Sequence, residues 1–238
     1  MSFNSAGYIS FPPKGVSLQW YHRFFEREDW FGAFLISIKI SSISMVFSTI
    51  LGTMTSFGLS RKEFFGKNML FVLILSPIIV PVIIFGTSLF YFFSRLHLLE
   101  NLYSMVLAHS LLGVPLVIVV VTATLQGFDV SIEQAARNLG ANWFQTFTRI
   151  IFPVVRPGII TGAFMAFMTS FDELIITMFL SGPTLRPLTV RMWEGLRTET
   201  DNTITAVSAI LVFIALVFML AFHILSRKTG QTATANIA

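Results

Sequence analysis

Cysteine is absent from this 238-residue sequence, and charged residues are scarce at 12%. Without cysteine the chain can form neither a disulfide framework nor a cysteine-based metal site. A soluble domain of this size carries about 25% charged residues, so the shortage of charge points to a lipid environment. Apolar residues make up 54% of the chain and include 26 phenylalanines. This composition indicates a membrane protein.

The motifs of several enzyme classes are also missing. The chain has no Gly-x-x-x-x-Gly-Lys-Ser/Thr phosphate loop, so it cannot hydrolyse ATP by that route. It has neither His-Glu-x-x-His nor Gly-x-Ser-x-Gly. Its 16 lysines and arginines are scattered and form no stripe, which argues against a nucleic-acid partner. We therefore expect a non-catalytic protein with no catalytic residue, metal or cofactor.

Five stretches are long and apolar enough to cross a bilayer, which takes roughly 20 residues. Lipid offers no partners to backbone polar groups, so each stretch must be a helix unless the chain closes into a barrel. The alternating segments of about ten residues that a barrel needs are missing. The predicted fold class is all-α, a polytopic membrane helix bundle, with kinks expected at Pro77, Pro81 and Pro115. The predicted spans are 31–59, 69–93, 103–125, 158–180 and 203–225.

A long connection, 126–157, separates the third and fourth predicted spans. Asp129 or Ser131 can cap the N-terminus of a short helix here, and Glu133 lies in its first turn, where the helix dipole favours an anion. Gly140 is expected to end this helix. The pattern predicts a first amphipathic helix outside the membrane.

A second short helix is expected over about 143–151, roughly at a right angle to the first. It presents Trp143, Phe144, Phe147 and Ile151 on one face, and Pro153 is expected to stop it. From periodicity alone, the whole connection could equally be an amphipathic segment lying on the membrane surface. The choice between these readings depends on a longer motif.

That motif resembles the loop of the permease subunits of ABC importers, which carry Glu-Ala-Ala, three residues, Gly, nine residues and Ile-x-Leu-Pro. Gln134 and Phe152 replace the family's Glu and Leu, and Glu133 lies beside Gln134. Which residue makes the charged contact is therefore open. The resemblance implies that the ATPase-coupling residues are Glu133, Gln134, Ala135, Ala136, Gly140, Ile150 and Pro153.

The resemblance also implies a mechanism and partners. In this family the loop docks on the ATP-hydrolysing subunit, and closure of two such subunits moves the membrane helices between inward-open and outward-open states. The expected partners are a second permease subunit, two ABC ATPase subunits, an extracytoplasmic solute-binding protein and the lipid bilayer of a bacterial inner membrane. Residues 31–228 would form the permease domain, 1–30 an extracytoplasmic segment and 229–238 a disordered cytoplasmic tail.

Other segments are similar to the polyamine-type permeases, which carry spermidine and putrescine. They are 11–21, which reads Phe-Pro-Pro-Lys-Gly-Val-Ser-Leu-Gln-Trp-Tyr, then Phe171 to Leu174, and Gly182-Pro183. Such permeases usually have six spans, and the first of these has no counterpart among the five expected here. Near relatives carry opines, iron or amino-acid-like solutes, and these remain alternatives for the substrate.

Ionisable groups inside predicted spans are functional candidates because they are costly in lipid. On an unbroken helix Glu173 shares a stripe with Thr169 and Thr177, so we expect it to face the substrate pathway. Asp172 shares its stripe with bulky apolar residues and is expected to be buried against another helix or a partner subunit. His109 is expected either to line the pathway or to hydrogen-bond a neighbouring helix.

Two functions of other classes compete with this interpretation. Asp172 and Glu173 could serve as an acid/base pair in an intramembrane enzyme, although their different directions and the lack of a nucleophile argue against it. A self-contained secondary transporter would normally show an internal repeat, and none is evident.

Overall fold

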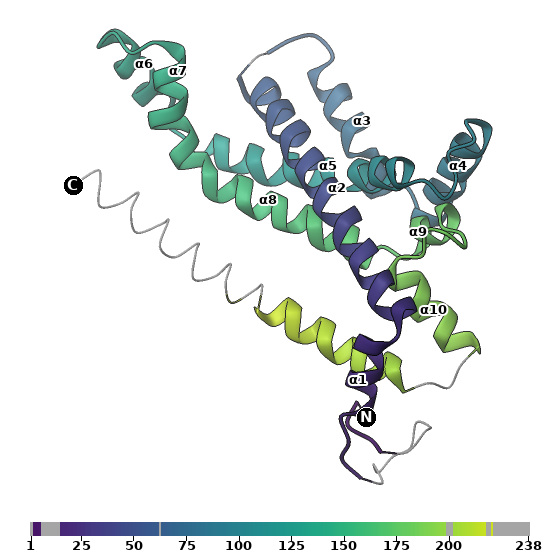
Figure 1. The fold of residues 1–238 in the computed structure, drawn as a ribbon. Helices are drawn as coiled ribbons and strands as arrows, with labels where there is room; N and C mark the ends of the chain where they lie inside the picture. The colour runs from purple at the N-terminus through teal and green to yellow at the C-terminus, as the bar shows by residue number, and fades with distance from the viewer. Residues whose placement is uncertain (1, 6–14, 62, 199–201, 218–219, 221–238) are drawn as a thin grey trace.

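The computed structural model describes residues 2–5, 15–61, 63–198, 202–217 and 220. Apart from a β-bridge between Asn4 and Val16, these residues form helices and the connections between them (Figure 1). The all-α prediction is confirmed. The expected tail at 229–238 and residues 11–14 of the N-terminal segment lie outside the described residues.

The chain runs from a short first helix into a long second one and continues through helices of very different length. They are α1 (Gln19–Glu26), α2 (Glu28–Arg61), α3 (Lys67–Ile79), α4 (Val82–Arg95), α5 (Leu102–Gln126), α6 (Val130–Asn138), α7 (Trp143–Thr146), a π-helical turn (Phe147–Ile151), α8 (Phe152–Asp172), α9 (Ile175–Leu180), α10 (Leu188–Thr198) and a further apolar helix, Thr203–Val217.

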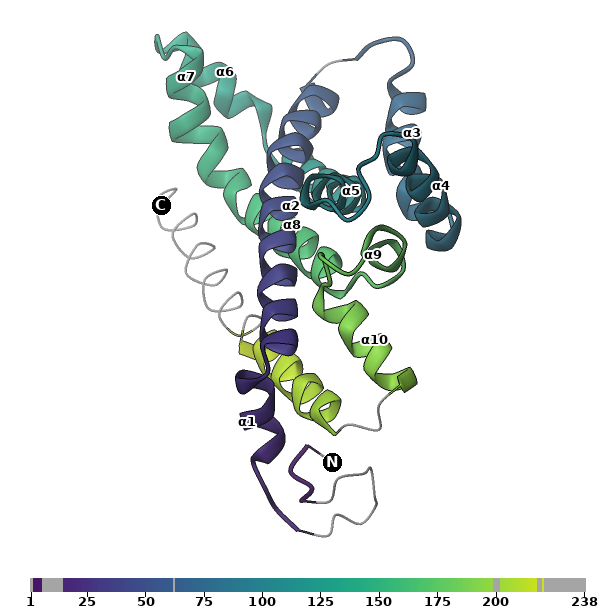
Figure 2. The ribbon, with the colours of Figure 1, turned by 45° about the vertical axis from the view of Figure 1, so that its right-hand side comes forward.

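Three of these helices, α2, α5 and α8, pack against one another at the centre of the molecule (Figure 2). The contact between α2 and α5 is made by small residues. Gly52 has no room for a side chain, because an added Cβ would lie 2.6 Å from the Cβ of Val117. Buried serines of α2 donate hydrogen bonds to backbone carbonyls of α5, and since the partners advance together along both chains, the two helices run parallel. The pairs are Ser44 with Val106 at 3.2 Å and Ser48 with Ser110 at 3.2 Å, and Ser56 shares its hydrogen between Ile118 at 3.3 Å and Gly52 of its own helix at 2.8 Å.

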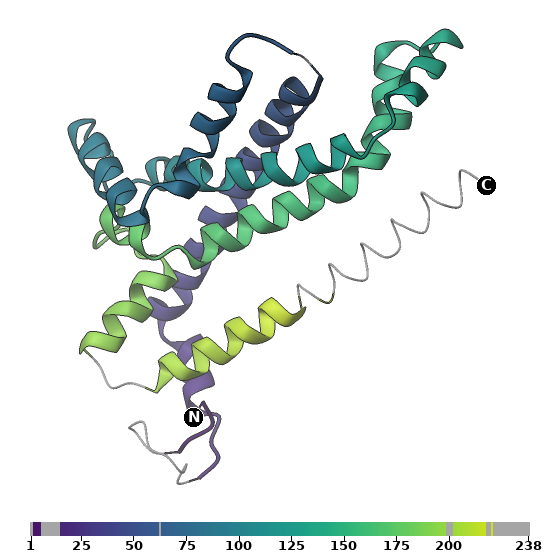
Figure 3. The same ribbon diagram turned by 180° about the vertical axis from the view of Figure 1, so that it is seen from behind.

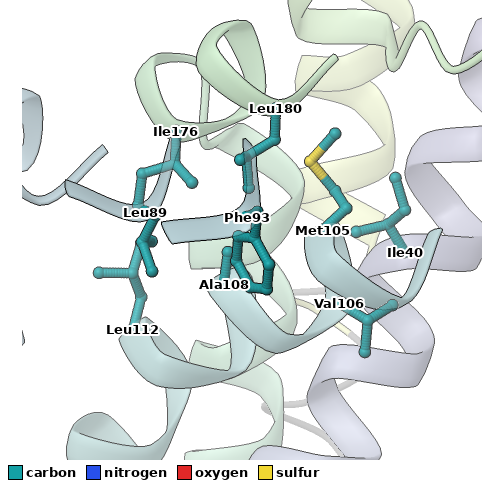
Figure 4. Packing of buried hydrophobic residues seen from close by; sticks show 9 residues of the cluster. All are labelled: Ile40, Leu89, Phe93, Met105, Val106, Ala108, Leu112, Ile176 and Leu180. Carbon is teal, nitrogen blue, oxygen red and sulfur yellow. The ribbon is translucent and has the colours of Figure 1, made fainter. Parts of the chain in front are cut away.

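A buried apolar cluster attaches α4 and α9 to this centre (Figure 4). Side chains from both short helices meet one face of α5, and Ile40 of α2 closes the cluster. Close packing of these apolar side chains holds the two short helices in place. The other members are Leu89, Phe93, Met105, Val106, Ala108, Leu112, Ile176 and Leu180.

The predicted spans agree with the structure in two cases out of the five. The stretches 31–59 and 103–125 lie within the unbroken helices α2 and α5, which are long and apolar enough to cross a membrane. The helix Thr203–Val217 covers the described part of the stretch 203–225, whose remainder lies outside the described residues except for position 220.

The other two predicted spans are not continuous helices. The stretch 69–93 is broken after α3, and α3 and α4 differ in direction by 99°. The break lies at Val80 and Pro81, because Pro81 cannot donate the backbone hydrogen bond that would continue α3. The stretch 158–180 is broken at Glu173, whose extended backbone, with ψ of 114°, ends α8.

The expected end of the second loop helix at Pro153 is also wrong. The helix that begins at Trp143 continues through the π-helical turn into α8 and ends only at Asp172. In this wide turn the backbone hydrogen bond joins residues five apart, from the N–H of Phe152 to the carbonyl of Phe147. This places Pro153 in the first turn of a new α-helical segment, where a missing N–H costs nothing.

The two ends of α2 mark opposite ends of the molecule. Its first residues adjoin α1 and the N-terminal residues, whereas Arg61 lies at the end that also carries α6 and α7 (Figure 3). The loop singled out by the motif therefore lies at the far end of the molecule from α1.

Candidate functional site

A cavity of about 850 Å³ opens beside the C-terminal end of α8, next to α10 and the helix Thr203–Val217. Its wall is largely apolar and aromatic. Phe167 and Phe171 stack with ring centroids 5.7 Å apart on one side, and Trp193 of α10 lies on the wall as well. Four residues bring polar side chains to the wall: Thr169, Asp172, Glu173 and Thr189.

The sequence predicted different surroundings for the two carboxylates, but both lie on the wall of this cavity. Asp172 is exposed in this chain beside Glu173, so no described helix of this chain buries it, and its burial against a partner subunit stays a prediction. The prediction assumed one continuous helix, but α8 ends between the two residues. Asp172 and Glu173 therefore do not follow one helical periodicity, on which their different predicted roles were based.

Glu173 has a local structural contact as well as a place on the cavity wall. Its Oε1 accepts a hydrogen bond from the backbone N–H of Ile176 at 2.9 Å, which caps the start of α9. Its backbone carbonyl accepts from the hydroxyls of Thr177 at 2.6 Å and Thr189 at 3.2 Å. The break after Asp172 is therefore a turn in which the carboxylate and the backbone carbonyl of Glu173 both accept hydrogen bonds.

His109 is buried and joins α5 to the broken helix. Its Nδ1 lies 2.8 Å from Ser170 Oγ on α8, and its Nε2 lies 3.1 Å from Thr177 Oγ1 on α9. Of the two alternatives considered for His109, the hydrogen bond to neighbouring helices is the one observed. A narrow gap that His109 lines together with Thr177 also touches Glu173, so the polar cluster adjoins the cavity through that residue.

The cavity wall formed by α10 is attached to the N-terminal half of α2. Arg191 Nη2 lies 2.9 Å from Asp29 Oδ2, and its guanidinium group lies 4.8 Å from the ring centroid of Trp30. Ser37 Oγ accepts a hydrogen bond of 2.8 Å from the backbone N–H of Leu188. These contacts fix α10 against α2 by an ion pair, a cation–π contact and a helix-start hydrogen bond.

At the other end of the molecule, α6 has the caps that the sequence indicated. Asp129 is its N-cap and accepts a hydrogen bond of 2.8 Å from the N–H of Ser131, which lowers the pKa of the Asp129 carboxyl. Gly140 has a φ of +90°, a conformation that glycine adopts without steric cost. The N–H groups of Gly140 and Ala141 bond back to carbonyls of α6, the pattern of a Schellman cap.

Glu133, one of the predicted coupling residues, faces inward. Its side chain is only 9% exposed and forms an ion pair with Arg61 at the end of α2. Gln134 and Ala135 are exposed beside it, and Ala136 is half-buried. Glu133 thus makes a charged contact within the chain, and Gln134 and Ala135 lie on the outward surface. Which of these residues contacts an ATPase subunit stays a prediction.

The remaining predicted coupling residues lie on the continuous helix 143–172, near the start of α8. Ile150 is half-buried within the π-helical turn, and Pro153 follows in the first turn of α8. The predicted aromatic face is mixed, since Trp143 and Phe144 are 61% and 67% exposed whereas Ile151 is buried at 3%. Trp143 and Phe144 stand at the start of the long apolar helix Trp143–Asp172, and exposed aromatic side chains at such an end are typical of a surface that contacts a partner.

Sequence reasoning missed α10 as part of the site. Its residues are too polar and too few for a span, so the search for apolar stretches passed over them. The available signal was the amphipathic run from Leu188 to Leu196, in which Leu188, Met192 and Leu196 recur at helical spacing. All three line the cavity.

A family model and the relatives with known names place this chain in the same family. The family model described as "Binding-protein-dependent transport system inner membrane component" matches residues 34–231. The spermidine/putrescine transport system permease protein PotC of Escherichia coli (strain K12) is 29% identical, over 99% of this chain and 89% of the relative. The putrescine transport system permease protein PotI of the same strain is 30% identical, over 97% and 84% of the two chains.

Solved structures agree on the fold. A bacterial alginate ABC transporter, crystallised with an alginate pentasaccharide-bound periplasmic protein, is similar with a TM-score of 0.74 at 17% identity, over 96% of this chain and 85% of that one. An amino acid ABC transporter crystallised with histidines gives a TM-score of 0.65 at 13% identity, over 90% of this chain and 100% of that one.

Proposed function

The chain belongs to the family of binding-protein-dependent transport system inner membrane components and is a multi-pass permease subunit of an ABC importer; we propose that its solute is a polyamine such as putrescine or spermidine. Relatives named for these two amines match almost the whole chain. Their names alone would leave the substrate open, because identity near 30% is compatible with a change of solute. The proposal therefore depends on the cavity.

The observation that carries the proposal is the pair of carboxylates, Asp172 and Glu173, on the wall of a largely aromatic and apolar cavity. An ammonium group leaving water for such surroundings needs an opposite charge or hydrogen-bond acceptors. Aromatic faces add a further attraction for cations. A linear polyamine, which is a chain of methylene groups between ammonium groups, matches both the apolar wall and its two acidic positions.

We assign the transport cycle to an assembly rather than to this chain alone. The chain provides one half of the pathway, and a second permease subunit provides the other. Two ABC ATPase subunits bind the end that carries α6 and α7, and a solute-binding protein docks at the opposite, extracytoplasmic end. The setting is a bacterial inner membrane, with residues 31–228 as the permease domain and 1–30 outside the cytoplasm. Hydrolysis of ATP belongs to the partner chains.

The test compares three variants in the assembled transporter. Asp172→Asn and Glu173→Gln remove one charge each, and Glu173→Gln keeps an oxygen that can still cap α9. Glu173→Leu removes both the charge and the cap. We expect Asp172→Asn and Glu173→Gln to lower ATP-dependent putrescine uptake about tenfold or more, as expected when a charge-assisted hydrogen bond of about 1.5–3 kcal/mol is lost. Glu173→Leu should in addition reduce the amount of assembled complex.

Glu63→Gln is the matched control, because Glu63 is an exposed carboxylate that pairs with Lys67 at the start of α3, away from the cavity. Uptake is normalised to the complex recovered from membranes. Wild-type uptake by both Asp172→Asn and Glu173→Gln would contradict a role of these carboxylates toward a cation. Transport of an uncharged solute in place of putrescine by the unmodified complex would contradict the substrate class.

A further inference from the structure

The contact between Arg61 and Glu133 joins two parts of the chain that are 72 residues apart in sequence. Arg61 is the last residue of α2, and Glu133 lies in the first turn of α6. The Glu133 side chain is 9% exposed and the Arg61 side chain 29%, so the pair is partly shielded from solvent. Ion pairs in such positions are screened much less than exposed ones.

The rest of α6 is attached mainly to its own neighbours in the sequence. It packs on α7 and on the π-helical turn, and it is linked to α5 through the turn at Gly127 and Phe128. Its exposed residues include Val130 and Ile132, and Leu139 is exposed at its C-cap. A force applied to α6 reaches the membrane helices through few contacts, of which the Arg61 ion pair is one that leads directly to α2.

The opposite end of α2 holds the wall of the cavity. Asp29 pairs with Arg191 of α10, and Ser37 accepts the hydrogen bond from Leu188 at the start of the same helix. Between these contacts and Arg61, α2 is one uninterrupted helix. A long unbroken helix moves as a rigid body, so a displacement at Arg61 is carried to α10.

From this arrangement we propose that Arg61 is a positioning residue for coupling: its ion pair with Glu133 makes α6 and α2 move together, and α2 passes that movement to the cavity wall formed by α10. The inference rests on the proposed role of the α6 end as the surface that meets the ATPase subunits. It assigns Glu133 to the inside of this surface and leaves Gln134 and Ala135 to face the partner.

The test uses the complete transporter with its ATPase subunits and a binding protein loaded with spermidine. Arg61→Glu and Glu133→Arg each place like charges together, and the double variant exchanges the two charges. We expect each single change to lower uptake per ATP hydrolysed about fivefold or more, the lower end of usual coupling between sites. The exchanged pair should recover most of the loss. Glu63→Arg, which alters a nearby exposed carboxylate, should have little effect.

A milder variant covers the case in which the charge reversals fail to assemble. Arg61→Gln should give a normal amount of complex with normal basal ATPase activity, but weaker stimulation by the loaded binding protein, because coupling is reciprocal. Wild-type stimulation of Arg61→Gln would overturn the inference, as would assembled single variants that the exchange does not rescue. If the unmodified complex itself shows no stimulation, the proposed function fails instead.

Discussion

At the scale of the residue, His109 is held in one defined hydrogen-bonded state. The Thr177 hydroxyl has a single hydrogen, which it donates to the carbonyl oxygen of Glu173 at 2.6 Å. Its oxygen must therefore accept from His109, and Nε2 carries the proton. The other ring nitrogen, Nδ1, is hydrogen-bonded to Ser170 Oγ at 2.8 Å. The chain of bonds runs from α8 through α5 to the turn at Glu173.

Replacement of His109 tests this chain of bonds. The amide of His109→Gln can donate to Thr177 and accept from Ser170, whereas His109→Leu can do neither. Interhelical hydrogen bonds of this kind contribute about 0.6–2 kcal/mol each in membrane proteins. We expect His109→Leu to unfold at a lower temperature than wild type in detergent, with His109→Gln between them. Equal melting temperatures for all three proteins would contradict the assignment.

At the scale of the element, three prolines in apolar stretches have two different outcomes. Pro115 lies within the unbroken α5 and Pro77 within α3, yet the chain turns sharply at Pro81. Pro115 is buried, and α5 continues unbroken past it. The described residues of α3 include no buried side chain, so nothing there opposes the break. Tertiary packing, which a single sequence does not display, decides whether a proline bends a helix.

The contact between α2 and α5 supports a prediction for Gly52. A valine there would place its Cβ at 2.6 Å from the Cβ of Val117 and push the helices apart. Overpacking of this kind costs about 1–3 kcal/mol. Gly58→Val is the matched control, since nothing lies within 4 Å of a Cβ built at Gly58 in the same helix. Gly52→Val should lower the melting temperature and the yield of folded protein more than Gly58→Val, and the reverse order would contradict the packing.

At the scale of the whole molecule, the structure places the α2–α3 connection and the α6–α7 loop at the same end, opposite α1 (Figure 1). Reporter fusions at Gly66 and Asn142 should therefore read the same side of the membrane, and with the proposed ATPase partners that side is cytoplasmic. A tag at Gly15 should be accessible from the other side. A periplasmic signal at Asn142 would contradict both the orientation and the coupling role of α6.

The sequence was informative about lengths and caps but not about interruptions. Apolar length is a property of the chain itself, so α2 and α5 were predictable, and Asp129 and Gly140 set the ends of α6 through local chemistry. The break at Glu173 depends on Thr189, which lies 16 residues further along the chain. The cavity likewise depends on α10 meeting α8, and Glu133 turns inward only because Arg61 lies beside it.

The break between α8 and α9 also determines how a solute is dehydrated on its way through. A helix that stops at membrane depth leaves backbone polar groups that lipid cannot satisfy, so such breaks persist only beside protein or water. Here the Glu173 side chain, which caps α9 through Oε1, lies on the cavity wall beside Asp172. For the proposed polyamine solute, an ammonium group arriving there would exchange water molecules for carboxylate oxygens one at a time, instead of losing its whole hydration shell in a single costly step.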